Sequence, residues 1–263
     1  MMRKPLILLS FVLLTNSLIG QIPDSSRIVR VLTFNILHGA TTKGDFDLDL
    51  IASVIKSAKP DLVALQEVDY KTNRAKKYDL VTELAFRTGM SPLFARAMPY
   101  DGGEYGEGIL SGFTFLSTKN HPLPYTEGKE PRAAAEVNVI LKSGDTIRFV
   151  GTHLDHERDP TNRLMQAKEL NRILTTDNRP AILTGDLNAT PEKAAMQELF
   201  TRWTRSFKED TPTFPSDDPT RKIDYILFRP AYRWRVLETQ VIDEKVASDH
   251  CPVLVVLELL PEQ

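Results

Sequence analysis

Alternating apolar and polar positions along the chain predict a mixed α/β fold. Apolar and often β-branched runs predict strands at residues 27–37, 61–66, 108–117, 133–141, 146–152, 181–184, 222–228, 232–241 and 253–259. Amphipathic spacing predicts helices at residues 45–58, 78–89 and 162–174. Pro191 is expected to open another helix, because proline is tolerated in a first helical turn.

The order of these elements predicts two β-sheets packed face to face with helices outside. Helices separate some strands, while others follow one another as hairpins, as at the turn 142–145. Strand periodicity alone suits an open, doubly wound sheet equally well. No repeat, low-complexity tract or linker rich in Pro, Gly or Ser interrupts residues 27–260, so we expect a single domain there.

The first 20 residues have the pattern of a secretory signal peptide. Arg3 and Lys4 precede the apolar run from Leu6 to Leu14, which is too short to span a bilayer. We expect cleavage between Gly20 and Gln21. The mature protein is therefore predicted to be secreted or periplasmic.

The net charge and the single cysteine argue against long DNA as the substrate and exclude an internal disulfide. The net charge of −2 lacks the basic excess typical of proteins that bind long DNA. The single cysteine, Cys251, has no partner for an internal disulfide, and the apolar run after it predicts a buried, inert thiol.

Polar side chains suited to binding cations and phosphate occur at the ends of several predicted strands. They are Asn35, Glu67, His153, Asp186 and Asn188 after strands, and Asp249 and His250 just before the last strand. We expect one site assembled from these strand ends. Hard oxygen ligands together with imidazoles suit a divalent cation and a phosphoryl group. The pattern therefore indicates metal-assisted hydrolysis of phosphoesters.

Six short motifs follow one another across the chain. They are Thr33-Phe34-Asn35, Leu65-Gln66-Glu67-Val68-Asp69, Gly151-Thr152-His153-Leu154, Thr184-Gly185-Asp186-Leu187-Asn188, Lys222-Ile223-Asp224-Tyr225 and Ser248-Asp249-His250. In these motifs and their order, the chain resembles the endonuclease/exonuclease/phosphatase superfamily of metal-dependent phosphoesterases, which includes DNase I and sphingomyelinases. The resemblance implies a four-layer α/β sandwich, two packed mixed β-sheets flanked by helices, with a Mg²⁺ or Mn²⁺ site at one end.

The resemblance also implies three metal-site residues. Glu67 would be the principal ligand, Asn35 would help to hold the metal or the scissile phosphate, and Asp249 would bind the metal directly or through water. Taken alone, a glutamate at a strand end is usually a solvated residue, and the alternative for Asn35 is a turn residue, because Asn tolerates unusual backbone angles.

The same resemblance assigns the catalytic residues. Asp186 would position or deprotonate the attacking water. Asn188 would bind a phosphate oxygen, and His153 would bind or protonate one. Asp224 would orient His250 and raise its basicity. The sequence does not decide how Asp186 and His250 share the role of general base. Asn188 is also a good helix N-cap residue.

A few further positions bear on which phosphorylated substrate the site would bind. Arg74 is a candidate cation for a substrate phosphate, although a solvated loop arginine fits the sequence equally well. The segment from Tyr105 to Ser111 carries Glu107 where the superfamily has an amide, and Gly112 stands where many members have arginine. We expect both changes to weaken phosphate attraction. Leu37 replaces an aspartate of abasic-site nucleases, which argues against DNA repair.

The sequence thus predicts an exported, metal-dependent phosphoester hydrolase that acts as a monomer without an obligate protein partner. Its substrate is expected to be a small molecule, a lipid head group or a nucleic-acid fragment. One alternative is an extracellular nuclease, whose basic groove would be supplied by Arg202, Arg205, Lys208, Arg221 and Lys222. Another is a catalytically inactive binding module on the same fold.

Overall fold

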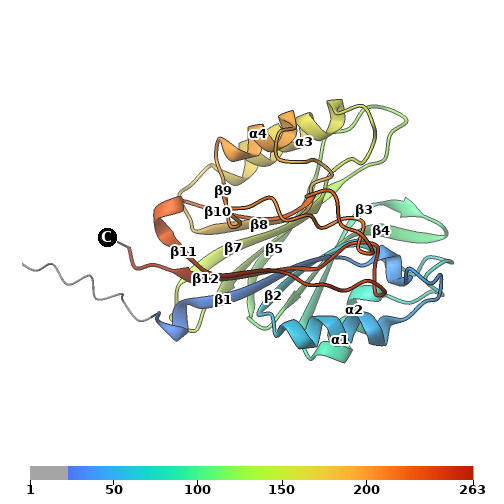
Figure 1. The fold of residues 1–263 in the computed structure, drawn as a ribbon, viewed down its shortest axis with the longest axis horizontal. Helices are drawn as coiled ribbons and strands as arrows, with labels where there is room; N and C mark the ends of the chain where they lie inside the picture. Colours follow the sequence, from blue (N-terminus) through green and yellow to red (C-terminus); the bar gives the residue numbers. More distant parts are fainter. Residues whose placement is uncertain (1–22, 263) are drawn as a thin grey trace, which may run out of the picture.

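Two mixed β-sheets of six strands each pack face to face in the computed structural model, which describes residues 23–262. Within this range, α1 and α2 cover the outer face of one sheet and α3 and α4 that of the other (Figure 1). The expected four-layer α/β sandwich is therefore confirmed. The expected signal peptide, residues 1–20, lies outside the described residues. No helix of the described part is long and apolar enough to cross a membrane.

The first sheet has the strand order β11-β12-β1-β2-β4-β3. Its strands are β1 (Ile28–Asn35), β2 (Leu62–Tyr70), β3 (Ser91–Tyr100), β4 (Gly103–Ser111), β11 (Trp234–Val241) and β12 (Val253–Leu259). Strands β1 and β2 are parallel, with Asn35 opposite Gln66. Their crossover connection is α1 (Leu48–Ala58), and α2 (Leu80–Thr88) follows β2.

The second sheet has the order β5-β6-β7-β8-β10-β9. Its strands are β5 (Phe115–Pro122), β6 (Ala133–Ile140), β7 (Thr146–His153), β8 (Ala181–Asp186), β9 (Thr204–Arg205) and β10 (Asp224–Arg229). Strands β7 and β8 are parallel, with His153 opposite Asp186, and α3 (Thr161–Leu174) connects them. Helix α4 (Ala194–Phe200) packs beside α3. The second sheet thus repeats the β-α-β arrangement of the first.

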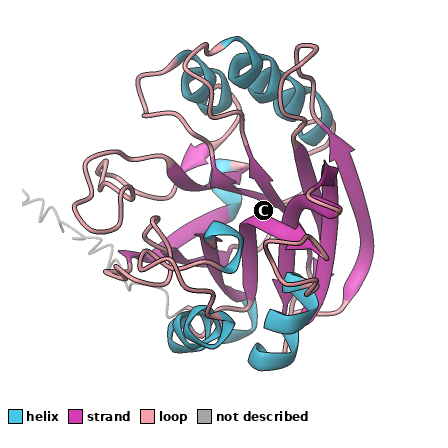
Figure 2. Ribbon diagram, turned by 90° about the vertical axis from the view of Figure 1, so that its right-hand side faces the viewer, coloured by secondary structure: helices cyan, strands magenta, loops and turns pink. Residues whose placement is uncertain are grey.

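Three apolar layers hold the sandwich together. The central layer joins the inner faces of the sheets, for example Val31 and Val255 to Phe149. The outer layers bury the apolar faces of the helices, such as Ile51 of α1 and Leu170 of α3. Full burial of each such side chain contributes about 1.5–3 kcal/mol. Figure 2 shows the helices on opposite outer sides of the paired sheets.

The parallel strand pairs determine where polar side chains meet. In β1 and β2, as in β7 and β8, the carboxyl ends leave the sheet at the same edge. The two sheets approach each other there through contacts of β1 with β8 and of β2 with β7. Residues at or near the carboxyl ends of these strands, including Glu67, His153 and Asp186, are therefore brought to one end of the sandwich.

Several predicted elements were wrong in detail. The strand expected at residues 108–117 is divided between the sheets, because β4 ends at Ser111 and β5 begins at Phe115. Edge strand β3 and the two-residue β9 were not predicted. The helix expected to open at Pro191 begins at Ala194. The expected burial of Cys251 is confirmed, and burial raises the pKa of its thiol to about 11.

Candidate active site

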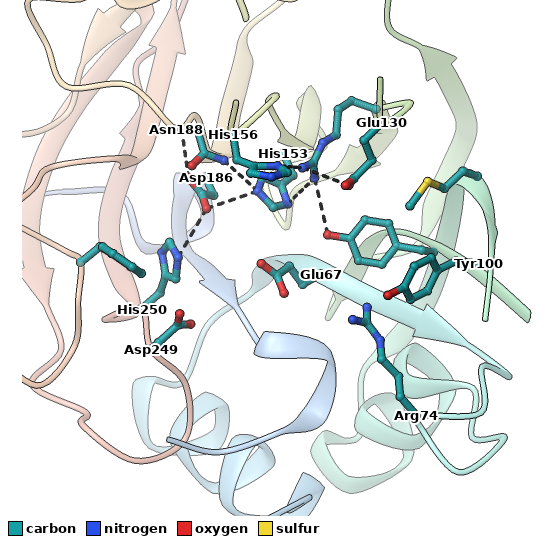
Figure 3. Close-up of a pocket in the computed structure, with 14 residues that line it drawn as sticks. Glu67, Arg74, Tyr100, Glu130, His153, His156, Asp186, Asn188, Asp249 and His250 are labelled. Atoms are coloured by element: carbon teal, nitrogen blue, oxygen red, sulfur yellow. Dashed lines mark hydrogen bonds and ion pairs between the residues drawn. The ribbon is translucent and has the colours of Figure 1, made fainter. Parts of the chain in front are cut away.

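A cavity of about 340 Å³ opens at the end of the sandwich where the parallel strands terminate. Figure 3 shows side chains from both sheets pointing into it. The cavity is lined by Glu67, Arg74, Met98, Tyr100, Tyr105, Glu130, Arg132, His153, His156, Asp186, Asn188, Phe214, Asp249 and His250. Most of the candidate residues therefore meet in one place. Asn35 and Asp224 lie behind this surface, buried and hydrogen-bonded to it.

Glu67 is aimed into the cavity by an irregularity of β2. The pairing of β2 with β4 shifts register between Leu65 and Val68, and Glu67 has a φ of 56°. Such bulges redirect a side chain away from regular alternation. Burial alone would raise the pKa of Glu67, but hydrogen bonds from His38 and Asn35 help to lower it to about 2. Glu67 is therefore ionised, and its carboxylate oxygens are of the hard type that divalent cations prefer.

Asn35 joins the two sheets at the base of the cavity. Its Nδ2 donates to Glu67 Oε1 and to Asp186 Oδ2, both at 3.2 Å. Its Oδ1 accepts a hydrogen bond from the backbone N–H of Leu37 at 3.1 Å. The side chain is fully buried. Asn35 thus fixes the distance between the two carboxylates.

Asp224, His250 and Asp186 form a buried chain. His250 Nδ1 lies 3.1 Å from Asp224 Oδ2, and its Nε2 lies 3.6 Å from Asp186 Oδ2. Thr213 Oγ1 donates to Asp224 at 2.6 Å, which fixes that carboxylate. Burial would lower the pKa of His250, but Asp224 and Asp186 outweigh it and raise the pKa to about 10. Burial raises the pKa of Asp186 to about 7.

His153 and Asn188 lie on the other side of Asp186. His153 Nε2 is 3.4 Å from Asp186 Oδ2, and the Asn188 amide nitrogen is 2.9 Å from the same ring atom. Asn188 has a φ of 49°, and its N–H donates to Asp186 Oδ1 at 3.0 Å. This turn folds the side chain back toward β7, where it also donates to Leu154 O.

The remaining predicted site residues lie at the cavity rim. Asp249 faces the space beside Glu67 (Figure 3). Arg74 forms a bidentate ion pair with the buried Asp69, with N–O distances of 2.7 and 2.9 Å. Its guanidinium also lies 4.5 Å from the ring centroid of Tyr100. Arg74 is therefore a rigid part of the wall rather than a solvated loop residue.

Sequence reasoning missed Arg132, Tyr100, Glu130 and His156 as cavity residues. Arg132 is 2% exposed and contacts His153, His156 and Glu130. It stands one residue before β6, in a stretch with no distinctive pattern. Only the three-dimensional pairing of β6 with β7 brings it beside His153. No signal in the sequence separates it from other arginines that precede strands.

Glu107, which was expected to weaken phosphate attraction, does not line the cavity. Its side chain is fully buried between the sheets, and neither carboxyl oxygen has a hydrogen-bond partner among the described residues. Burial raises the pKa of Glu107 well above its ordinary value. Burial therefore favours the neutral form of this carboxyl group, which does not line the cavity. Position 112 is a backbone turn that leads from β4 toward β5.

Two groups of residues have the donors that a divalent cation needs. Glu67 and Asp249 offer carboxylates to the same open space, and Asn35 lies next to Glu67. Asp186, Asp224 and His250 also have donor atoms within 4.8 Å of one another. The second group is already joined by its own hydrogen bonds and ion pairs. The carboxylates of the first group face the open cavity, and oxygen donors suit Mg²⁺ or Mn²⁺.

The fold and the site together define a chain with a phosphoesterase fold. A model of the Endonuclease/Exonuclease/phosphatase family matches residues 32–250, nearly the whole described range. The chain belongs to this family, whose members are generally hydrolases of phosphoester bonds.

Solved structures share the fold over most of the chain. A family protein from Beutenbergia cavernae superposes with a TM-score of 0.74 and 21% identity, covering 89% of this chain and 72% of its own. The Bacteroides thetaiotaomicron mannosyl-6-phosphatase superposes with a TM-score of 0.71 and 20% identity, and the match covers 87% of this chain and 99% of that protein. The human Nocturnin catalytic domain superposes with a TM-score of 0.69 and 17% identity, and the match covers 90% of this chain and 96% of that domain. At these identities the similarity establishes the fold.

Proposed function

We propose that the protein is an exported, divalent-metal-dependent hydrolase of small phosphoesters. The observation that carries this proposal is the convergence of carboxylates, imidazoles and an amide from both sheets around one cavity of about 340 Å³. Glu67 and Asp249 supply anionic oxygens, while His153 and Asn188 supply groups for a phosphate. No covalent intermediate is required, because water is the nucleophile.

The residues fit a bound Mg²⁺ or Mn²⁺. Glu67, Asn35 and Asp249 would hold the ion, since Glu67 is ionised and its oxygens and those of Asp249 face the cavity. The bound ion would polarise the phosphoryl group as a Lewis acid. Asn35 also donates to Asp186, so one side chain hydrogen-bonds both the cation ligand Glu67 and the candidate base.

Asp186 is the better candidate for the general base. His250 is held between Asp224 and Asp186, and both carboxylates favour its protonated form. A protonated imidazole has no free lone pair with which to accept a proton from water. The Asp186 carboxylate retains acceptor capacity, and its pKa of about 7 suits proton transfer near neutrality. His250 would orient Asp186 and stabilise negative charge.

The phosphate oxygens would be held on the opposite side. His153 and the Asn188 amide lie together beside Asp186, and both line the cavity. Hydrogen-bond donors fixed before the reaction stabilise the charge that develops on phosphate oxygens in the transition state. The backbone turn at Asn188 and the packing of His153 keep these groups in place.

A small substrate fits the cavity better than a polynucleotide. None of the five basic residues expected to form a nuclease groove lines the cavity. Lys222 is 4% exposed, with Nζ 4.4 Å from the Phe207 ring centroid, and Arg205 is paired with Asp210. Aromatic and polar side chains at the rim, such as Tyr100 and Glu130, suit a sugar ring. The similarity to a mannosyl-6-phosphatase supports a phosphorylated sugar as the first substrate to test.

Export is part of the proposal. The apolar segment after Arg3 and Lys4 supports cleavage before Gln21. A chain expressed in a bacterial host should be recovered outside the cytoplasm with Gln21 as its first residue, as mass spectrometry would determine. Recovery in the cytoplasm with the N-terminal segment intact would contradict this proposal.

Hydrolysis assays test the function directly. We expect phosphate release from sugar 6-phosphates and p-nitrophenyl phosphate with Mg²⁺ or Mn²⁺, loss of activity with EDTA, and little activity on duplex DNA. Glu67→Gln and Asp186→Asn should each lower kcat/KM at least about 100-fold. Glu209→Gln, the same change at an exposed position outside the cavity, serves as the matched control. Cation binding without turnover of any phosphoester would indicate a binding module instead.

A further inference from the structure

We propose that Arg132 is a positioning residue that fixes His153 as a neutral imidazole with its proton on Nε2. The role rests on an unusual partner for an active-site imidazole, a cation instead of a carboxylate. Its consequence for catalysis rests on the proposed function, whereas the protonation form of the ring is independent of any activity.

The two terminal nitrogens of the Arg132 guanidinium are engaged on the cavity wall, whereas its Nε is buried without a hydrogen-bond partner among the described residues. Nη1 lies 2.8 Å from His153 Nδ1 and 3.5 Å from the Tyr105 hydroxyl, while Nη2 lies 3.0 Å from His156 Nδ1. Glu130 forms an ion pair with Nη2 at 3.0 Å. Figure 3 shows dashed lines from His153, His156 and Glu130 meeting between the histidine rings and Glu130. The side chain is 2% exposed, so its direction is set by packing.

The chemistry of guanidinium leaves one arrangement for His153. Arginine has five N–H donors, no acceptor, and remains charged in proteins. A ring nitrogen 2.8 Å from Arg132 Nη1 must therefore accept, which requires a free lone pair on Nδ1. The ring proton then resides on Nε2, which faces Asp186 Oδ2 at 3.4 Å. Asp186 is the acceptor for this N–H, because the Asn188 amide nitrogen donates to Leu154 O.

The two imidazoles of the site consequently have opposite partners. Asp224 holds His250 and favours its charged form, whereas Arg132 holds His153 and disfavours it. Burial, reinforced by Arg132, His250 and His156 against the opposing charge of Glu67, lowers the pKa of His153 well below its ordinary value. Opposite environments of this kind separate the roles of paired titratable groups. His153 would thus donate a hydrogen bond to a phosphate oxygen without delivering a proton.

Nitrogen NMR of the purified protein tests the assignment. The chain has five histidines, so ¹⁵N-histidine labelling gives a tractable spectrum. A His153→Gln variant identifies the His153 signals. At pH 7 we expect a proton-free Nδ1 and a proton-bearing Nε2 for His153. A wild-type ring that carries its proton on Nδ1, or on both nitrogens, would overturn the proposal whether or not the protein hydrolyses phosphoesters.

Substitution of Arg132 tests the cause. In Arg132→Met, the Nδ1 resonance of His153 should move toward its protonated position and the ring should titrate at higher pH. Arg132→Lys retains one cationic donor and should largely restore the wild-type spectrum. Arg74→Met changes another cavity arginine, whose partners are Asp69, Tyr100 and Tyr105; it is the matched control and should leave His153 unchanged. An unchanged His153 spectrum in a folded Arg132→Met protein would contradict the proposal.

Discussion

Asp186 illustrates how burial and hydrogen bonds adjust one side chain. The carboxylate lies within 3.6 Å of both active-site imidazoles and accepts from Asn35 and from the Asn188 backbone. Burial opposes its ionisation more than these partners favour it, so its pKa rises to about 7. The residue that we propose as the base is therefore half ionised near neutral pH.

This ionisation predicts the pH dependence of the reaction. A base must be deprotonated to accept a proton, so kcat/KM should rise about tenfold per pH unit below pH 7 and level off above it. The measurement is kcat/KM between pH 5 and 9 at saturating Mg²⁺ or Mn²⁺. A profile that falls as the pH rises through 7 would contradict the role of Asp186.

The raised pKa of Glu107 predicts that the free energy of unfolding depends on pH. Its folded-state pKa lies well above the ordinary value of 4.5, so its contribution is fully present below pH 4.5 and is lost as the pH rises. Glu107→Gln cannot ionise and should therefore raise the free energy of unfolding at pH 8.

Urea unfolding of Glu107→Gln and the wild type at pH 8 and pH 4 measures this effect. The difference should vanish near pH 4, where both proteins are neutral at this position. A variant that is less stable than the wild type at pH 8 would show that Glu107 is ionised and paired.

At the residue scale, sequence reasoning recovered the side chains that occupy strand ends. Glu67, His153 and Asp186 follow recognisable apolar runs, and the fold brings them together. Their proposed roles stay predictions. Arg132 was missed because its importance depends on strand pairing between β6 and β7. The environment of Glu107 was misjudged because alternation along β4 does not tell which face lies between the sheets.

Among the elements, the parallel pair β7 and β8 depends on a glycine. Gly185 has a φ of +148°, and a Cβ at this position would lie 1.8 Å from the Thr152 carbonyl oxygen. Gly185→Ala should therefore force β7 and β8 apart and lower the free energy of unfolding by about 2–5 kcal/mol. Denaturant unfolding measures the change.

Gly144→Ala is the control for Gly185→Ala. Gly144 also has a positive φ, +87°, but no atom lies within 4 Å of its added Cβ, so its cost should be near 1 kcal/mol. Equal destabilisation by the two changes would show that the backbone angle, and not the close strand approach, requires Gly185.

The elements best predicted from sequence have a strong local pattern. Helix α1 combines an Asp47 N-cap with an apolar face, and β12 is a buried strand that is apolar except at Glu258. Strand β3 was missed because it is an edge strand with mixed exposure and two prolines. The boundary between β4 and β5 was missed because the apolar pattern continues while the chain changes sheets around Gly112.

At the scale of the whole molecule, the site is shared between two sheets. Glu67 comes from the first sheet and His153 and Asp186 from the second, while Asp249 and His250 precede β12. Their mutual arrangement therefore depends on the packing of the complete sandwich. Six motifs in order predicted that packing because a resemblance across the chain carries long-range information that local periodicity lacks.

Cation binding should stabilise this arrangement. A ligand that binds only the folded state adds about 2.7 kcal/mol at a hundredfold excess over its Kd. We expect Mg²⁺ or Mn²⁺ to raise Tm in differential scanning calorimetry, and Glu67→Gln to remove most of the rise. Glu209→Gln should behave as the wild type. A cation-induced rise that survives in Glu67→Gln would place the ion elsewhere.

The most direct test of the central claim is hydrolysis of a small phosphate monoester in H₂¹⁸O with saturating Mg²⁺ or Mn²⁺. If water attacks phosphorus at the cavity formed by Glu67, Asp186 and His250, the released phosphate should contain one ¹⁸O atom and the alcohol none, as mass spectrometry would detect. Asp186→Asn should suppress this release. Label in the alcohol, or undiminished release by Asp186→Asn, would contradict the proposed mechanism.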